Sequence, residues 1–370
     1  MSEENLPEPD RIEGAPHPRH TDRLHGQAEA EATFLEAATS GRMHHAWMLT
    51  GPRGVGKATL AWRAARFLLA GSGEGGLFGA PTTLEIDPED PVSRRVAALS
   101  EPRLALLRRP WNDKTKKLRA EITVEEVRRL RSLFEMSAAG GGWRVAIVDA
   151  LDEMNMNAAN ALLKLLEEPP AQSVFLLVCH RPGSVLPTIR SRCRELRLKP
   201  LGPDDLGPAL AQAGFDAGGD ARALAELTAG SVGDAVEMIA AEGPALYARL
   251  LGLVGTSPGL DRREALAIGD SLSGRGAEER NRLAHRLIGK LLHRLARTGA
   301  LGQPPAEAVA GEAGILTRLA PDPGAGRAWA DLSATLSPRV AHALGVNLDP
   351  AQVFLDTCLQ IDATARKTTS

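Results

Sequence analysis

The stretch WMLTGPRGVGKAT, residues 47–59, decides the fold of this chain. Apolar residues predict a short buried strand over 46–49, and an apolar-rich run predicts a helix over 60–69. Between the two lies a glycine-rich loop that ends in Gly56-Lys57. A glycine loop between a strand and a helix lets backbone N–H groups converge on an anion, and the lysine adds a positive charge. The stretch therefore predicts a phosphate-binding loop in an α/β domain.

One residue of this loop departs from the pattern of a magnesium-dependent nucleotide site. The residue after Gly-Lys is normally Ser or Thr, whose hydroxyl holds magnesium. Here that residue is Ala58, and Thr59 follows one position late. We therefore expect the loop to hold phosphate and to be poorly equipped to hold the metal.

A second candidate site residue stands at the end of a buried strand predicted over 143–148. An apolar strand that ends in Asp149 can aim a carboxylate at a magnesium shell. An aspartate that only caps the strand end is the alternative interpretation. The next residue is Ala150, where an ATPase of this type carries Glu to activate water. Loss of a water-activating group costs roughly 10²–10⁴-fold in rate, so we expect this chain's own ATPase activity to be absent or very weak.

Two further positions bear on nucleotide chemistry. Ser191-Arg192-Cys193 lies at the end of a short helix predicted over 187–192, and an arginine at a helix end can reach the γ-phosphate of a neighbouring subunit. Such an arginine finger contributes on the order of 10³–10⁵ in rate; a solvated surface arginine is the alternative. The sequence GSVGDA begins another helix, and Gly233 stands there where a nucleotide-sensing arginine is often found.

The predicted site residues fall into two groups. Arg192 is the candidate catalytic residue, acting as a finger in trans. The candidate nucleotide-binding residues are Gly51, Arg53, Gly54, Gly56, Lys57, Ala58, Thr59 and Asp149. No metal site is predicted, because the three cysteines at 179, 193 and 358 have the spacing of neither a zinc site nor a disulfide framework.

The predicted elements indicate an α/β domain followed by helices. Strands predicted at 46–49, 104–107, 143–148, 173–179 and 193–198 alternate with helices, which is typical of a parallel sheet covered on both faces. From residue 203 the pattern is helical. The predicted organisation is a flexible arm over 1–20, a nucleotide-binding-like α/β domain over 21–200, a three-helix lid over 201–243 and an all-α domain over 244–370.

Composition limits the classes of protein that fit. The chain has 44 basic and 46 acidic residues and a net charge of −2, which argues against a protein whose whole surface coats nucleic acid. The basic runs at 114–119 and 280–297 are therefore interpreted as solvated faces rather than DNA contacts. An acidic, proline-rich start and the lack of a long apolar run predict a cytoplasmic protein with no membrane partner.

Three stretches carry a resemblance to a known family. GPRGVGKA, IVDALDEMNMNAANALLKLLEEPP and HRPGSVLPTIRSRC resemble the delta-prime subunits of the bacterial DNA polymerase III clamp loader, which belong to the AAA+ class. The resemblance covers roughly residues 24–241. It implies an AAA+ P-loop domain, a helical lid and a helical collar that joins a pentameric ring with gamma or tau and delta subunits.

The resemblance also implies a function in DNA replication. The ring opens the sliding clamp and places it on primed DNA, within a DNA-directed DNA polymerase (nucleotidyltransferase) holoenzyme. A delta-prime subunit does not itself drive ATP hydrolysis, and it presents the arginine of its Ser-Arg-Cys motif, Arg192 here, to ATP bound by the adjacent gamma or tau subunit. We expect ATP or ADP to be bound without turnover. Many relatives carry a four-cysteine zinc module, but residues 71–100 contain no cysteine, so no zinc is predicted.

Three alternatives remain at this point. An ATP-hydrolysing gamma or tau subunit would need Ser or Thr at 58, Glu at 150 and Arg at 233, and none is present. A stand-alone P-loop kinase or GTPase leaves the Ser-Arg-Cys motif and the helical last third without a role. A DNA-binding scaffold without a nucleotide role would rest on the two weak basic runs alone.

Overall fold

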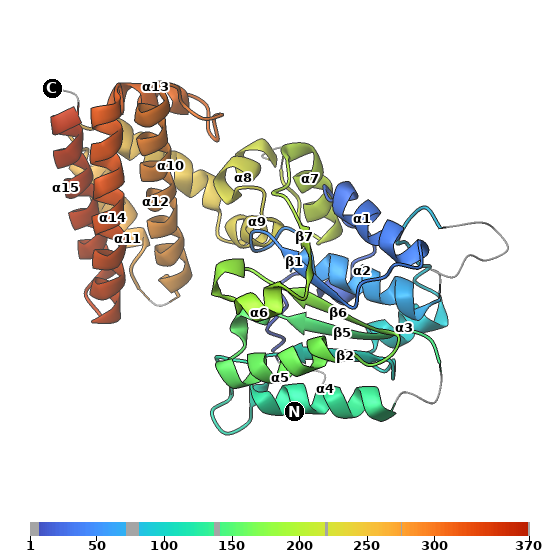
Figure 1. Cartoon of the computed structure of the whole chain (residues 1–370). Coiled ribbons are helices and arrows are strands. Elements are labelled where there is room, and N and C mark those ends of the chain that lie inside the picture. Colours follow the sequence, from blue (N-terminus) through green and yellow to red (C-terminus); the bar gives the residue numbers. More distant parts are fainter. Residues whose placement is uncertain (1–6, 72–80, 137–140, 219–220, 275, 369–370) are drawn as a thin grey trace. The chain divides into compact units, whose positions relative to one another are not determined.

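The computed structural model describes residues 7–71, 81–136, 141–218, 221–274 and 276–368 (Figure 1). The chain forms two compact units. The N-terminal unit comprises residues up to 216 together with 231–233, and the C-terminal unit comprises 217–230 and the residues from 234 onward. The predicted zinc-free segment 71–100 falls partly outside the described residues, at 72–80, and the start of the predicted arm, 1–6, lies outside them as well.

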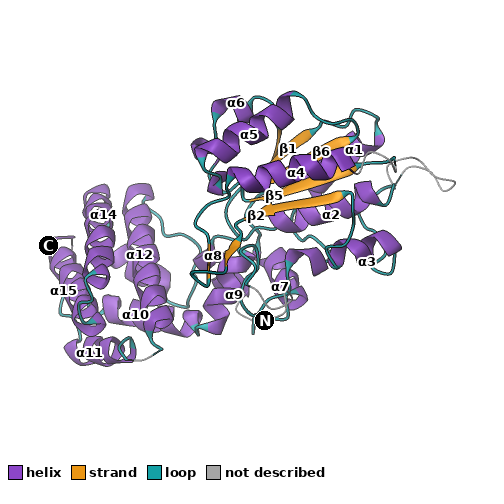
Figure 2. Cartoon of the chain, turned by 90° about the horizontal axis from the view of Figure 1, so that it is seen from below, coloured by secondary structure: helices purple, strands orange, loops and turns teal. Residues whose placement is uncertain are grey.

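A five-stranded parallel sheet forms the centre of the N-terminal unit (Figure 2). Its order is β2-β5-β6-β1-β7, so the strand that precedes the glycine loop lies inside the sheet. All four pairings are parallel, with Met48 beside Leu177 and Ile147 beside Leu176. The strands are β1 Ala46–Thr50, β2 Leu104–Arg108, β5 Arg144–Asp149, β6 Ser173–Val178 and β7 Arg194–Arg197. This confirms the predicted parallel α/β fold.

Helices cover both faces of this sheet, which explains why β1 and β6 are buried along their whole length. The glycine loop leads into α2 Lys57–Leu69, which packs against β1, β5 and β6. Two other helices, α1 Ala28–Thr39 and α3 Pro91–Ala97, contact α2. The remaining helices of this unit are α4 Val124–Met136, α5 Met156–Glu167, α6 Pro187–Arg190 and α7 Pro203–Gln212.

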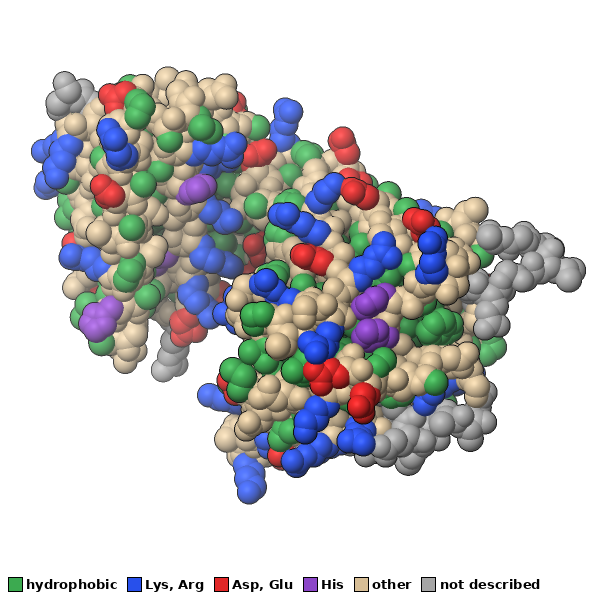
Figure 3. All heavy atoms as spheres, viewed as in Figure 1, with side chains coloured by type: hydrophobic (Ala, Val, Ile, Leu, Met, Phe, Trp, Pro, Cys, Tyr) green, Lys and Arg blue, Asp and Glu red, His purple; other side chains and the backbone are tan. Residues whose placement is uncertain are grey.

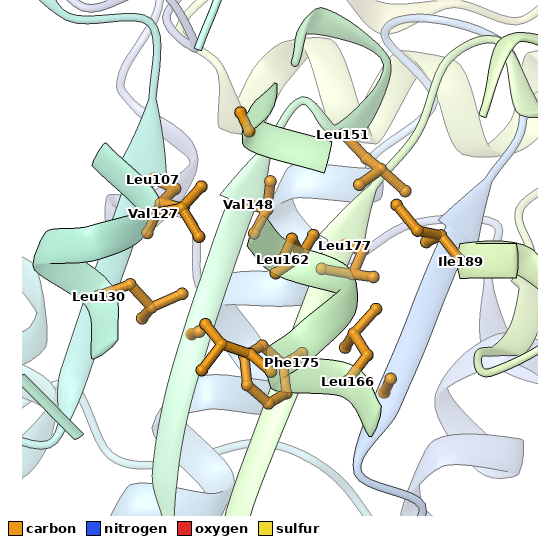
Figure 4. Packing of buried hydrophobic residues seen from close by; sticks show 14 of the residues in the cluster. Leu107, Val127, Leu130, Val148, Leu151, Leu162, Leu166, Phe175, Leu177 and Ile189 are labelled. Carbon is orange, nitrogen blue, oxygen red and sulfur yellow. The ribbon is translucent and has the colours of Figure 1, made fainter. Parts of the chain in front are cut away.

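A hydrophobic cluster joins α4, α5 and α6 to one face of the sheet (Figure 4). Leu162 and Leu166 of α5 lie over Leu177 and Phe175 of β6, and Ile189 points into the same cluster from α6. All five side chains are at most 2% exposed. Burial of a side chain of this size contributes roughly 1.5–3 kcal/mol, so the short α6 is fixed by its core residue rather than by its length.

The N-terminal segment makes buried contacts in its described part, and the flexible arm over 1–20 stays a prediction. The Asp10 carboxylate lies 3.0 Å from His17 Nε2 and forms an ion pair with Arg108 at 2.7 Å. The Asp10 and His17 side chains are only 1% exposed. The His17 ring lies edge-on to Trp62 of α2 at 5.6 Å. Proline and charge made this segment look disordered, but Glu8 and Asp10 form ion pairs with Arg19 and Arg108 in the fold.

The C-terminal unit is helical. Its helices α12 Glu278–Leu301 and α14 Pro323–Gly345 pack along each other. The others are α8 Ala221–Thr228, most of α9 Val232–Ala240, α10 Gly243–Gly255, α11 Arg262–Ser271, α13 Glu312–Leu319 and α15 Pro350–Thr368. The predicted lid is divided between the units, because α7 belongs to the N-terminal unit and α8 to the C-terminal unit. The domain borders at 200/201 and 243/244 stay predictions.

A buried polar network ties three helices of this unit together. Glu312 of α13 accepts hydrogen bonds from the Tyr247 hydroxyl of α10 at 2.6 Å and from Nε of Arg294 of α12 at 2.6 Å. The Ala308 N–H donates to the other carboxylate oxygen at 2.7 Å. Both oxygens of this buried carboxylate accept hydrogen bonds, so the negative charge of Glu312 is compensated inside the bundle.

The two basic runs differ in structure. Residues 111–118 form a small hairpin of β3 Trp111–Asn112 and β4 Lys117–Leu118. On α12, Arg286 pairs with Glu237 at 3.0 Å and Arg280 with Glu242 at 3.3 Å, as expected for a solvated ion-paired face. Basic and acidic side chains are interspersed over the visible surface (Figure 3). None of the described helices is long and apolar enough to cross a membrane.

Candidate nucleotide site and finger arginine

The glycine loop between β1 and α2 has a backbone that requires its glycines. Gly51, Gly54 and Gly56 have φ angles of 134°, 75° and 101°. A Cβ on Gly51 would lie 2.5 Å from the Leu198 carbonyl oxygen, and one on Gly56 would lie 2.6 Å from Leu24 Cδ1. Both the backbone conformation and the space therefore exclude side chains at these positions.

The loop has the donor set that an anion requires. Among the described residues, no backbone carbonyl accepts a hydrogen bond from the N–H groups of residues 53–58. These groups precede and begin α2, so the positive end of the helix dipole adds to them. Phosphate oxygens therefore fit this loop, and residues 53–58 would hold them.

Lys57 supplies a cation at the base of the loop. Its side chain is buried, and its ammonium group donates to the Gly51 carbonyl at 2.8 Å and also to the Pro52 carbonyl. Burial lowers the pKa of Lys57 to about 8, while the charge of Asp149 acts in the opposite direction. The lysine is thus largely charged at neutral pH, and a phosphate group would compete with the two carbonyls for it.

Asp149 ends β5 and is buried, as the sequence predicts for a strand-end carboxylate. Burial raises the pKa of Asp149 to about 7, the charges of Asp10 and Glu153 raise it further, and Lys57 opposes them. Ala150 is also buried, at 2% exposure. No carboxylate therefore stands at position 150 to activate water.

The raised pKa of Asp149 gives a stability prediction with a definite sign. Between about pH 4 and pH 7 the folded chain binds a proton that the unfolded chain has lost, so stability falls as pH rises through this window. We expect Asp149→Asn to remove this fall in stability, which is at most about 1.4 kcal/mol for each pH unit. Urea unfolding of both proteins at several pH values measures it.

Asp152→Asn is the matched control, because the shift there has the opposite direction. Burial opposes the ionisation of Asp152, but hydrogen bonds from the His180 N–H and from Arg181 leave its pKa lowered. The stability that ionised Asp152 contributes is present above the pKa of Asp152 in the unfolded chain. This stability is lost as pH falls through the pKa in the folded chain. Asp152→Asn should therefore cost stability at pH 7 and little at low pH. Parallel pH profiles for the two variants would contradict both assignments.

Gly233, where the sequence lacks a sensing arginine, lies close to the glycine loop. The Val232 N–H donates to the Gly54 carbonyl at 2.9 Å, and a Cβ on Gly54 would collide with Ser231 Oγ. A Cβ on Gly233 would lie 2.9 Å from Ile12 Cδ1 and 3.3 Å from Gly54 Cα. A side chain at 233 would therefore require the end of Ile12 to move and would lie in close contact with Gly54.

Sequence reasoning missed several residues around the loop. Asp152 and His180 lie just beyond the carboxyl ends of β5 and β6. The backbone N–H of His180 donates to the Asp152 carboxylate at 2.8 Å. Burial and the charge of Lys57 lower the pKa of His180 to about 4, so this imidazole is neutral at pH 7. Their place after parallel strands was the available signal. Ile12 and Leu24 carried no signal, because only the fold brings them to the glycines.

Few side chains around the glycine loop could bind a metal ion. Ala58 offers no hydroxyl, as the sequence shows, and Thr59 is half-buried one position later. Over the described ranges, no group of three or more His, Cys, Asp and Glu side chains is placed to hold a metal ion. The residues present thus fit the phosphates of a nucleotide, with Lys57 and the loop N–H groups as its donors, better than they fit magnesium.

Arg192 lies on a rigid segment of backbone after α6. The Arg192 N–H donates to the Ile189 carbonyl at 3.0 Å and the Cys193 N–H to the Arg190 carbonyl at 3.2 Å. The Arg192 side chain is 36% exposed; its Nη1 donates to the Thr188 carbonyl at 2.9 Å, and its Nη2 forms an ion pair with Glu167 at 2.8 Å. The guanidinium is thus at the surface and is held at both ends.

The parallel sheet, the glycine loop between β1 and α2, and helices on both faces define a P-loop α/β domain. Residues 26–202 match the family model described as "DNA polymerase III, delta subunit". Over this region the chain is similar to that family, and the resemblance seen in the sequence is confirmed there.

Two named relatives are similar to parts of this chain. DNA polymerase III subunit delta' of Pseudomonas aeruginosa is 38% identical over 151 residues, which are 40% of this chain and 41% of that protein. DNA polymerase III subunit tau of Escherichia coli is 31% identical over 176 residues, which are 48% of this chain and 25% of that protein. The chain thus matches about two fifths of the length of the delta' relative.

A solved structure also aligns with most of the chain. It is a DNA polymerase III gamma subunit-related protein from Thermotoga maritima, which is 17% identical with a TM-score of 0.34. The alignment covers 93% of this chain and 100% of that one.

Proposed function

We propose that this chain is the delta-prime subunit of a bacterial clamp loader and that it acts on ATP bound by its neighbour. In this function it joins gamma or tau and delta subunits in a ring, which places the sliding clamp on primed DNA during replication. Similarity to the DNA polymerase III delta family model and to a delta' subunit supports the assignment. The observation that carries the functional part is Arg192, an exposed guanidinium on a fixed backbone.

The state of the chain's own nucleotide site supports the same assignment. The loop retains its glycines and Lys57, whereas Ala58 and Ala150 lack the groups for metal and water. Gly233 has no side chain where a sensing arginine is often found. We infer that the chain binds ATP or ADP and does not hydrolyse it. A gamma or tau type of subunit, which hydrolyses ATP, is disfavoured by the same three residues.

The assembly itself is the first test of this proposal. The full chain is mixed with gamma or tau and with delta from the same organism, and the mass of the product is measured by light scattering after size exclusion. We expect one stable complex that contains all three kinds of subunit and has clamp- and DNA-stimulated ATPase activity. A chain that elutes alone under these conditions would remove the proposal.

Nucleotide binding without turnover is a separate prediction for the isolated chain. We expect a fluorescent ATP analogue to bind, with no phosphate released above the background of the assay. Lys57→Met should weaken binding about 10- to 100-fold, because a hydrogen bond to a charged group contributes roughly 1.5–3 kcal/mol. Lys164→Met, at an exposed position of α5, is the control and should bind normally. Rapid turnover by the isolated chain would contradict the inert-site interpretation.

A further inference from the structure

The acidic residue that contacts Arg192 stands in an unfavourable place for a carboxylate. Glu167 is the last residue of α5, where the helix dipole presents its negative end. Glu168 follows it, and Pro169 and Pro170 end the helix. A second carboxylate at this end adds repulsion, so the intrinsic stability of α5 gives no reason for Glu167. Glu167 forms an ion pair with Nη2 of Arg192 at 2.8 Å.

The contact joins two segments whose backbones are both fixed. Leu166, next to Glu167, and Ile189, three residues before Arg192, are buried in the same hydrophobic cluster. The Thr188 carbonyl accepts the other end of the guanidinium at 2.9 Å. Because both backbones are anchored, the arginine side chain has few ways to keep both contacts. The pair therefore selects one orientation of the guanidinium.

The pair is weak enough to be exchanged. The Glu167 and Arg192 side chains are 43% and 36% exposed, and ion pairs at such positions contribute little. A terminal phosphate carries more negative charge than a carboxylate and accepts two parallel hydrogen bonds from one guanidinium. A phosphate brought close to Arg192 would thus take the guanidinium from Glu167, whereas solvent chloride would not.

We propose that Glu167 is the positioning residue for Arg192: it holds the finger against α5 as a counter-ion and yields it to the phosphate of a neighbour's ATP. The inference rests on the proposed function of Arg192 and adds a restraint on the timing of its action. When the ring is poorly aligned, the guanidinium stays with Glu167. When the neighbour's phosphate comes within reach, the exchange is favourable.

The first test uses the isolated chain and does not depend on any ATPase. Glu167→Gln keeps the shape of the side chain and removes its charge, and Glu168→Gln is the adjacent, exposed control. Phenylglyoxal, a reagent for free guanidinium groups, is applied, and its reaction at Arg192 is followed by mass spectrometry with Arg190 as internal reference. We expect the Arg192 reaction to be about two- to five-fold faster in Glu167→Gln only. Equal rates in the two variants overturn the inference.

The second test uses the reconstituted complex. Without clamp and DNA, Glu167→Gln should raise ATP hydrolysis about two- to five-fold, because the finger is released before the ring is aligned. With clamp and DNA the rate should stay within about 1.5-fold of the unmodified complex, since phosphate then displaces Glu167 anyway. In the Arg192→Ala background the Glu167→Gln effect should vanish. An unstimulated rate equal to that of Glu168→Gln overturns the restraint.

The finger role of Arg192 and the positioning role of Glu167 can be disproved separately. If Arg192→Ala leaves hydrolysis unchanged, the finger role itself is wrong, whatever Glu167 does. If Arg192→Ala lowers hydrolysis while Glu167→Gln changes neither the reagent rate nor the unstimulated rate, only the role of Glu167 is wrong.

Discussion

Replacing Arg192 with alanine should lower hydrolysis at the adjacent ATP site of the reconstituted complex by about 10³-fold. The physical reason is that a finger arginine meets negative charge that develops as the phosphoryl group is transferred, and fingers contribute on the order of 10³–10⁵ in rate. Arg192 is suited to this because its backbone is fixed by hydrogen bonds while its guanidinium reaches the surface. Alanine keeps the backbone and removes only the charge.

The measurement must separate this one site from the other ATP sites of the ring. Rapid-quench hydrolysis in a single turnover counts the ATP cleaved per complex, and the Arg192→Ala complex should lose the phase that belongs to the adjacent site. Light scattering checks that the ring still assembles. Arg190→Ala is the matched control, because Arg190 is an exposed arginine on the same turn and donates only a long 3.4 Å bond to the Pro182 carbonyl.

Two further observations sharpen the experiment. Arg192→Lys should recover only part of the rate, because an ammonium group cannot form the parallel pair of hydrogen bonds that a guanidinium forms. The finger assignment fails if Arg192→Ala and Arg190→Ala complexes hydrolyse ATP equally fast while both remain assembled.

Replacing Gly299 with alanine should destabilise the C-terminal unit by about 3 kcal/mol, at the upper end of what overpacking usually costs. Helices α12 and α14 approach so closely that a Cβ on Gly299 would lie 2.6 Å from the Asp322 carbonyl oxygen and from Gly326 N. These are backbone atoms, so no side chain can rotate away. The helices must separate along their contact instead.

Gly289→Ala is the matched control in the same helix. No heavy atom outside its own helix and neighbours lies within 4 Å of a Cβ at this position. Alanine there should stabilise α12 by up to about 1 kcal/mol, which is the difference in helix propensity. Urea unfolding of the full chain, followed by circular dichroism, compares the two. Equal stability of the two variants would show that α12 and α14 are not packed at this distance.

Much of the fold could be predicted from local patterns. Apolar runs at 46–49, 143–148 and 173–179 predicted three central strands, and each occurs within one or two residues of the prediction. Such predictions succeed because strands buried on both faces are apolar throughout. The small hairpin at 111–118 was not predicted, since its strands are two residues long and carry no periodic signal.

The site was predictable only where chemistry is local in the sequence. The spacing of the glycines and Lys57 predicted the loop, and Ala58 and Ala150 predicted its lack of catalytic groups. The assignments of nucleotide and finger residues stay predictions until the variants above are measured. The ion pairs of the N-terminal segment were not predicted, because composition reports how polar a segment is and not whether its charges find partners.

The sequence by itself determined the class of the protein: a strand, a glycine loop, a lysine and a Ser-Arg-Cys turn at the spacing of a clamp-loader subunit. Only the tertiary structure decided how closed the loop is and what holds the finger. Val232 reaches Gly54, and Glu167 reaches Arg192, across 178 and 25 residues of chain respectively. The physical reason is that motifs record which groups are available locally, whereas contacts between distant residues exist only after packing has placed their backbones.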